Sequence, residues 1–361
     1  MQLIKKMAEN KKNILLKLLK VVFNLYKMIT NKKPVALFIS VLLLFINIST
    51  ASNSSPNTLK CKFCKKSIKS RYITQGKNAY HESCYKDHIQ LRCYHCKKLI
   101  DGTYNLSNDK NYHEKCYKDF ILEKCDVCFK PIEQLYVKDN YGNIYHNYHR
   151  SAMPLCESCN RIICTSITDG GVRINKRRSV CNICWNYVIN DKSKINRIYK
   201  DVRKVLMSIG INNIPEKIPI RLVDSKRDLQ ELSKTFLPDG IQGYTRYDYQ
   251  KIRDKKIKEK FTIYMLSNLH EINFRAVLAH ELMHVYLFVN NISLRNSLVE
   301  GFCNLGTEHV YRSYPNSKIG QLKLEAMAKD KDPEYGKGYR IMSSELKNIG
   351  WKDLISKLEK Y

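Results

Sequence analysis

This sequence has few acidic residues and no apolar run of comfortable membrane-spanning length. Its 361 residues include 34 Asp and Glu against 63 Lys and Arg, which gives a formal net charge of +29. The positive electrostatic field of such a chain favours acidic partners, namely anionic membrane surfaces, polyanions or acidic substrates. A Lys/Asn/Ile-rich coding bias would produce the same charge. Because the chain also lacks an arginine-rich helix and any nucleic-acid motif, we do not expect nucleic acid to be its partner.

The longest apolar run, residues 35–46, is short for a membrane span. Lys32 and Lys33 precede it, and small residues follow at Ser49-Thr50-Ala51, where a signal peptidase could cleave. This is the layout of a secretory signal. We therefore expect residues 1–51 to be a signal peptide, residues 52–60 a linker, and the mature protein to be secreted or periplasmic. A start at Met28 would give a signal of ordinary length, and the alternative is an uncleaved membrane anchor.

Twelve of the fourteen cysteines recur with four histidines in a pattern that begins at residues 61, 93, 125 and 156, a period of 31 or 32 residues. We call these repeats modules 1 to 4. Each supplies two pairs of ligand residues, which suits a closed, tetrahedral structural zinc site. The sets are Cys61, Cys64, His81 and Cys84; Cys93, Cys96, His113 and Cys116; Cys125, Cys128, His146 and His149; and Cys156, Cys159, Cys181 and Cys184.

The alternative to zinc sites is a disulfide framework formed by these cysteines. Export of the protein to an oxidising compartment would favour it. Disulfides give no reason for histidine at ligand positions in three modules, so we predict four structural Zn²⁺ ions. Modules this small bury little core, and the metal would supply their folding free energy. Aromatic residues beside the ligands are expected to form small cores. Cys164 and Cys303 are left over as ordinary thiols.

The most informative short motif is His280-Glu281-Leu282-Met283-His284. A helix places residues i and i+4 on one face, so the two imidazoles can bind one Zn²⁺. Glu281 can then act as the general base that takes a proton from the attacking water. Apolar residues recur at helical spacing around the motif, which predicts a buried helix. The alternative is a buried helix whose histidines serve only as hydrogen-bond partners.

A catalytic zinc site needs a third protein ligand, and Glu300 is the candidate. The alternative is a capping box, in which Glu300 would reach back to the backbone of Ser297. Asn304 and Thr307 share the Glu300 face of the predicted helix and are candidates for supporting the ligands. His309 falls near the opposite face. Gly301 would let two helices approach closely because it has no side chain.

The elements around the motif are those expected of a zincin-type peptidase. The sequence predicts a helix over 194–209, a strand over 218–223, a helix over 226–236 and a turn and strand over 240–249. Residues 261–266 are rich in aromatic and β-branched residues and read as a strand. A strand beside the zinc helix could hold a substrate backbone by strand addition. Tyr244, Tyr247, Tyr311 and Tyr339 are candidate donors to a developing oxyanion.

The chain resembles the LIM-containing peptidases that limit organ size in plants, the "DA-one" family, and their bacterial relatives. The resemblance covers residues 93–308. It is carried by Cys93-Tyr-x-Cys96, by His113 through Cys128, by the 218–223 strand, by Leu278-Ala279-His280-Glu281-x-Met283-His284, and by Glu300-Gly301-x-Cys303. It implies a zinc metallopeptidase joined to LIM and LIM-like modules. The family's downstream histidine falls on Glu308, and the plant proteins' ubiquitin-interacting helices have no counterpart, so neither role is transferred.

Together these patterns predict an α+β protein in which a zincin-like metallopeptidase domain follows a tandem array of small zinc-ribbon or LIM-like modules. The expected domains are modules 1 and 2 over 61–116, modules 3 and 4 over 117–190, and the peptidase over 191–361. We expect a zinc-dependent endopeptidase with one catalytic and four structural Zn²⁺, a protein or peptide substrate, and a protein partner on the array. The alternative is a non-catalytic adaptor. Contact with a membrane would come through the N-terminal segment.

Overall fold

The computed structural model describes residues 59–234, 241–252 and 255–360. The chain divides into two compact units, residues 1–123 and 124–361. The fold is mixed α/β, as expected. The predicted signal or anchor and nearly all of the predicted linker lie outside the described residues. Within the described part, no helix is both long and apolar enough to cross a membrane.

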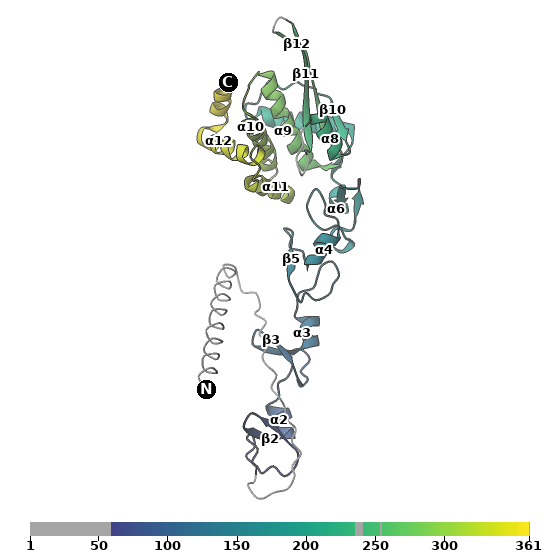
Figure 1. Ribbon diagram of the computed structural model, residues 1–361, viewed down its shortest axis with the longest axis vertical. Helices are drawn as coiled ribbons and strands as arrows, with labels where there is room; N and C mark the ends of the chain where they lie inside the picture. The colour runs from purple at the N-terminus through teal and green to yellow at the C-terminus, as the bar shows by residue number, and fades with distance from the viewer. Residues whose placement is uncertain (1–58, 235–240, 253–254, 361) are drawn as a thin grey trace, which may run out of the picture. The chain divides into compact units, whose positions relative to one another are not determined.

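Each module is built from a ligand-bearing turn, a two-stranded antiparallel hairpin and a short helix (Figure 1). The third ligand ends the second strand, and the fourth is the third residue of the helix, so the hairpin-to-helix junction fixes the spacing between the two. The elements are β1 (Tyr72–Gln75), β2 (Asn78–His81) and α2 (Glu82–His88); β3 (Tyr104–Ser107), β4 (Lys110–His113) and α3 (Glu114–Phe120); β5 (Tyr136–Lys138), β6 (Ile144–His146) and α4 (Asn147–Ala152); and α5 (Thr165–Thr168), β7 (Gly171–Arg173), β8 (Ser179–Cys181) and α6 (Asn182–Trp185). The predicted boundary between residues 116 and 117 falls inside α3, and the compact units divide after Glu123 instead.

The predicted small aromatic cores are present in the modules. Tyr80 and Tyr85 are buried against Cys61 in module 1, and Tyr112 and Tyr117 are buried against Cys93 in module 2. Tyr145 is fully buried in module 3, and Trp185 packs against the cysteines of module 4. Each module therefore has only a few buried side chains of its own.

The rest of the second unit contains one larger core. Its elements are β9 (Val188–Ile189), α7 (Lys192–Met207), β10 (Ile220–Val223), α8 (Lys226–Ser233), β11 (Gly243–Ile252), β12 (Lys255–Leu266), β13 (Leu269–His270), α9 (Glu271–Val289), α10 (Asn296–Arg312), α11 (Lys318–Lys329) and α12 (Tyr335–Leu358). The predicted order of helices and strands is present, with ends displaced by a few residues. The side chains of Asp191 and Ser225 cap α7 and α8, where short polar residues favour helix starts.

The three-stranded sheet has the order β10-β12-β11. β12 is the central strand, parallel to β10 and antiparallel to β11. The proposed role of residues 261–266 in strand addition is therefore wrong, because neighbours on both sides already use the backbone groups of β12 there. β11 is the edge strand next to α9, and Figure 1 shows the β11–β12 hairpin extending beyond β10.

Glycines let the helices beside this sheet approach closely. A Cβ on Gly301 of α10 would lie 2.3 Å from the carbonyl oxygen of Gly338 in α12. A Cβ on Gly338 would lie 1.8 Å from the carbonyl oxygen of Ser297. The expectation for Gly301 is confirmed, and α12 is the helix that approaches it. On the opposite side of α10, a Cβ on Gly306 would meet Met283 of α9 at 2.6 Å.

Module 4 is joined to this core through Arg178, whose side chain is only 2% exposed. The guanidinium donates to both carboxylate oxygens of Glu157, at 2.9 and 2.6 Å. It also donates to the carbonyl oxygens of Asp224 and Ser267, which follow β10 and β12. β9 then pairs with β13, and α9 begins at the next residue. The predicted domain boundary at residue 190 thus separates residues that are tied together.

Candidate metal centres

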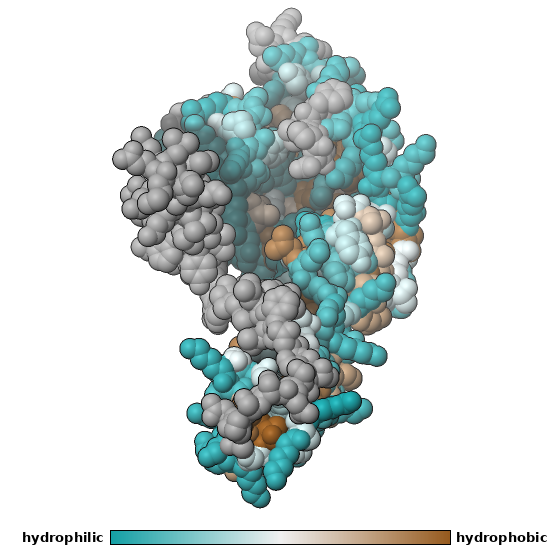
Figure 2. All heavy atoms as spheres, turned by 60° about the horizontal axis from the view of Figure 1, so that its bottom comes forward, coloured by the Kyte–Doolittle hydropathy of each residue, from teal (hydrophilic) through white to brown (hydrophobic). Residues whose placement is uncertain are grey.

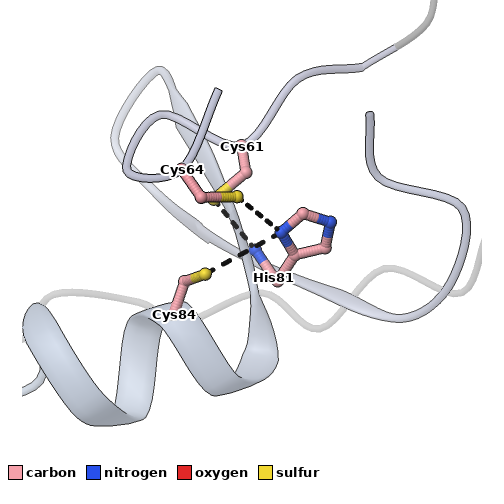
Figure 3. Close-up of side chains that lie close together, drawn as sticks. All are labelled: Cys61, Cys64, His81 and Cys84. Carbon is pink, nitrogen blue, oxygen red and sulfur yellow. Dashed lines mark hydrogen bonds between the residues drawn. The ribbon is translucent and has the colours of Figure 1, made fainter. Parts of the chain in front are cut away.

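The ligand atoms of module 1 converge on one point (Figure 3). Nδ1 of His81 lies 3.3 Å from Sγ of Cys64 and 3.9 Å from Sγ of Cys84, and the His81 backbone N–H donates to Sγ of Cys61. The other ring nitrogen, Nε2, donates to the carbonyl oxygen of Ser67 at 3.2 Å. That hydrogen bond holds the proton on Nε2 and leaves the Nδ1 lone pair aimed at the sulfurs, as a metal ligand requires.

Modules 2 and 3 repeat this arrangement. Nδ1 of His113 lies 3.3 Å from Sγ of Cys96, and Nε2 donates to the carbonyl oxygen of Leu99 at 2.9 Å. Nδ1 of His146 lies 3.6 Å from Sγ of Cys128, and Nε2 donates to the carbonyl oxygen of Pro131 at 3.2 Å. The agreement between modules with different sequences indicates that the histidine geometry belongs to the motif.

His149 provides a direct test of whether module 3 fits a metal ion. Its Nε2 atom is buried and has no hydrogen-bond partner. Burial lowers the pKa of this imidazole, which favours the neutral form that can donate a lone pair. A buried nitrogen without a partner is costly unless something occupies its lone pair. The ligand atoms of Cys125, Cys128 and His146 converge with that of His149, so a metal ion fits.

Module 4 consists of four buried cysteines. Sγ of Cys159 lies 3.8 Å from Sγ of Cys181, and Nε of Arg161 donates to Sγ of Cys159 at 3.3 Å. Hydrogen bonds from the other three thiols lower the pKa of Cys156, which favours the thiolate that a metal binds.

The backbone also favours thiolates in modules 1 and 2. Although burial opposes it, N–H groups of Cys64 and His81 lower the pKa of Cys61 to about 6. The corresponding N–H groups lower the pKa of Cys93 to about 6. None of the fourteen cysteines forms a disulfide in the structure. Cys/His groups that could hold metal ions therefore occur at all four positions given by the repeat.

The fifth group is formed by α9 and α10. Nε2 of His280 lies 3.2 Å from Nε2 of His284, one helical turn later. Glu300 of α10 places one carboxylate oxygen 3.1 Å from Nε2 of His280 and the other 3.7 Å from Nε2 of His284. Three potential ligands from two helices thus surround one point, and each is only about one-sixth exposed.

Glu300 does not form the capping box that was its alternative role. Arg295, rather than Ser297, occupies the N-cap position of α10. No side chain accepts a capping hydrogen bond at this helix start. The carboxylate faces the histidines, and their proximity lowers its pKa against the opposing effect of burial. A charged carboxylate is thereby kept beside the two imidazoles.

Asn304 is one turn beyond Glu300 and orients the first histidine. Its Oδ1 accepts a hydrogen bond from Nδ1 of His280 at 3.1 Å, which leaves Nε2 to face Glu300. Thr307 has a different role from the one expected. Its hydroxyl donates to the carbonyl oxygen of Ala276, so this hydrogen bond joins α10 to α9.

Glu281 lies beside this group with its carboxylate buried. Oε2 accepts a hydrogen bond from the hydroxyl of Thr245 in β11 at 2.8 Å. Burial raises the pKa of Glu281 to about 7, although His280 and Thr245 both act to lower it. A carboxylate that titrates near neutral pH is well suited to accept and return a proton.

Cys303 is a further residue near the two histidines, one that the sequence suggested would be an ordinary thiol. Its Sγ atom lies within 4.8 Å of a ring nitrogen of each of His280 and His284. The side chain is fully buried, and burial raises the pKa of its thiol well above the ordinary value. Glu300 is the better ligand candidate, because both of its oxygens face the histidine nitrogens and its charged form is favoured.

One tyrosine beside the site was not singled out by the sequence. Tyr335, the first residue of α12, lies nearly parallel to the ring of His280, with the centroids 6.4 Å apart. Burial, with Glu300 and Glu281 nearby, raises its pKa. Of the four tyrosines expected to be candidates, Tyr311 donates to Asn273 and Tyr247 to Glu259, so these hydroxyls are already engaged.

Comparison of the chain with known protein families finds no match, and comparison with curated proteins finds none.

Proposed function

We propose that the protein is a zinc-dependent endopeptidase of zincin type, in which modules 1 to 4 are structural zinc units. His280, His284 and Glu300 would hold the catalytic ion. Zinc there would act as a Lewis acid toward the substrate carbonyl and the attacking water. The observation that carries the proposal is the convergence of two imidazoles and one carboxylate beside a second, buried glutamate.

Glu281 is the general base in this proposal. It takes a proton from the attacking water and returns it to the leaving amine when the peptide bond breaks. The hydroxyl of Thr245 holds Oε2 of this carboxylate, and Oε1 is the oxygen proposed to take the proton. The resemblance to LIM-containing peptidases supports the same assignment, since it rests on the residues that the structure brings together.

The edge strand β11 is the proposed site of the substrate backbone. It passes Glu281 at Thr245, and its outer side has no neighbouring strand in the described part of the chain. An extended peptide could pair with this edge and present its carbonyl groups to the site. Tyr335 is the proposed donor to the oxyanion, because its hydroxyl makes no hydrogen bond within the described residues and its ring faces His280.

The array is proposed to recruit a protein partner or the substrate. Modules 1 and 2 each expose a stacked aromatic pair, with Phe63 on His88 at 4.1 Å and His95 on Phe120 at 4.0 Å between ring centroids. The pairs recur 32 residues apart with phenylalanine and histidine exchanged. Among the residues that Figure 2 colours, hydrophilic ones predominate. Exposed aromatic rings are common contact points for protein partners.

The test compares His284→Ala with His309→Gln in the purified full chain. His309 lies on α10 and packs against Trp351, outside the group of ligands. We expect His284→Ala to bind one zinc fewer and to lose about 10³-fold or more of peptide cleavage, while His309→Gln keeps both. Equal cleavage by wild type and His284→Ala would exclude this metal site, and no cleavage by wild type would favour the adaptor.

A further inference from the structure

An aromatic shelf lies beside the candidate metal site, formed by Tyr247, Tyr249, Phe261 and Phe288. The ring of Tyr247 is at its centre, with centroid distances of 4.7 Å to Phe261, 4.9 Å to Phe288 and 5.0 Å to Tyr249. Tyr249 is 44% exposed and Phe288 is 37% exposed. The shelf is therefore an apolar surface in contact with solvent, formed by three rings of the strongly charged β11–β12 hairpin and by Phe288 of α9.

The shelf and the metal site share the seam between α9 and β11. Thr245 of β11 contacts Glu281 of α9, and Tyr247, two residues further along β11, contacts Phe288. Two residues of a strand cover about 7 Å. Phe288 is one helical turn beyond His284, a rise of about 6 Å. The shelf is thus displaced from the site by about two residues along β11, the strand on which the peptide backbone is proposed to lie. A substrate side chain close to the cleaved bond would therefore reach it.

A fixed positive charge accompanies the rings. Nζ of Lys256 lies 5.3 Å from the ring centroid of Tyr247 and 5.4 Å from that of Tyr249. It donates one hydrogen bond to Asn291 at 2.7 Å, which leaves further N–H donors on the ammonium group. Residues 243–260 contain seven Lys and Arg and three Asp and Glu, a net charge of +4. The hairpin therefore attracts carboxylates to the place where it exposes aromatic rings.

We infer that the aromatic shelf and Lys256 form a specificity subsite for an acidic peptide substrate. The shelf takes an aromatic or large aliphatic side chain one or two residues from the cleaved bond, and Lys256 pairs with an adjacent Asp or Glu. The inference rests on the proposed peptidase function. It adds a substrate class to that function: extended segments in which a large apolar residue neighbours a carboxylate.

The test measures cleavage preference in a pool of tryptic peptides from a whole proteome. Wild type is compared with Tyr249→Ala and Lys256→Glu, and with Lys347→Glu, an exposed residue of α12 that gives the same change in net charge. Lys256→Glu should lose the preference for an acidic residue by about threefold or more, while Lys347→Glu keeps it. Tyr249→Ala should lower the preference for a large apolar residue about two- to tenfold.

Binding provides a readout that does not need turnover. Full-length Glu281→Gln, alone and combined with Lys256→Glu, is titrated with fluorescein-labelled Gly/Ser peptides that carry Phe-Glu, Phe-Lys or Ala-Glu. The subsite predicts that Phe-Glu binds most tightly and that Lys256→Glu removes its advantage over Phe-Lys.

The outcomes separate the two proposals. If the pool is cleaved with the same preference by all variants, the subsite is wrong while the peptidase stands. If wild type cleaves nothing, the peptidase is wrong, and the binding arm decides the subsite: Phe-Glu must still bind most tightly, and equal binding of the three peptides overturns it.

Discussion

At the scale of single residues, a hydrogen bond on one ring nitrogen of His81, His113, His146 and His280 leaves the other nitrogen available to a metal ion. A backbone carbonyl accepts from Nε2 of His81, His113 and His146, so Nδ1 is the candidate ligand atom of these three histidines. In the fifth group Asn304 accepts from Nδ1 of His280, so Nε2 is the candidate ligand atom. Removing such a partner commonly costs about 10- to 100-fold in metal affinity.

The third ligand is the first prediction at this scale. Glu300→Ala should lose the fifth zinc and all measurable cleavage, because the two histidines alone hold a metal ion weakly. Cys303→Ala should keep five zinc ions and most activity, since its buried thiol favours the neutral form. Zinc content and cleavage are measured on both variants. The reverse pattern, with zinc lost from Cys303→Ala and kept in Glu300→Ala, would make Cys303 the ligand.

Most of the candidate ligand residues could be predicted from the sequence, since local backbone geometry sets the spacing between ligands. The hairpin-to-helix junction fixes the last two ligands of each module, and one helical turn fixes His280 and His284. Thr307 could not be assigned, because a helix face does not reveal whether a hydroxyl meets an imidazole or a carbonyl. Tyr335 was missed because it reaches the site from a helix 55 residues beyond His280.

At the scale of elements, the site depends on how closely three helices pack. α10 presents Glu300 to α9 on one side and Gly301 to α12 on the other. The strand order beside them could not be predicted from pattern alone, since both β11 and β12 are rich in aromatic and β-branched residues. Which of them is the edge strand is decided by the crossover that places β10 beside β12.

The Gly301–Gly338 contact gives a prediction about stability. Gly338→Ala should destabilise the protein by about 1–3 kcal/mol or more, because the new Cβ would overlap the Ser297 carbonyl oxygen. Gly320→Ala is the matched control in α11, where the nearest atom would be 3.4 Å from the new Cβ. Replacing a helical glycine there should stabilise the helix by up to about 1 kcal/mol. Denaturant unfolding measures both, and equal effects would contradict the close approach.

At the scale of the whole molecule, the fourth module belongs to the candidate catalytic unit as much as to the array. Arg178 joins Glu157 of module 4 to the ends of β10 and β12, and β9 pairs with the strand that leads into α9. The repeated ligand spacing placed this module with the array, over residues 117–190. The chain's ligand repeat continues through it, whereas its hydrogen bonds attach it to the larger core.

The junction can be tested through Arg178. Arg178→Met should destabilise the second unit by about 3–5 kcal/mol, because it leaves a partly buried Glu157 and two carbonyl oxygens without their donor. Arg227→Met, which removes an exposed ion pair with Glu231, should change stability by less than about 1 kcal/mol. Thermal unfolding with zinc present compares the two. A loss confined to module 4, with the core unchanged, would show that the junction is weak.

The central claim is that the group on α9 and α10 hydrolyses peptide bonds with Glu281 as its base. The most direct measurement is cleavage of a peptide pool by full-length wild type and Glu281→Gln, prepared with equal zinc content. Glu281→Gln keeps every candidate ligand but cannot accept the proton, so its cleavage should fall by about 10²- to 10⁴-fold. Cleavage by Glu281→Gln at the wild-type rate, with the zinc content of both proteins equal, would contradict the account.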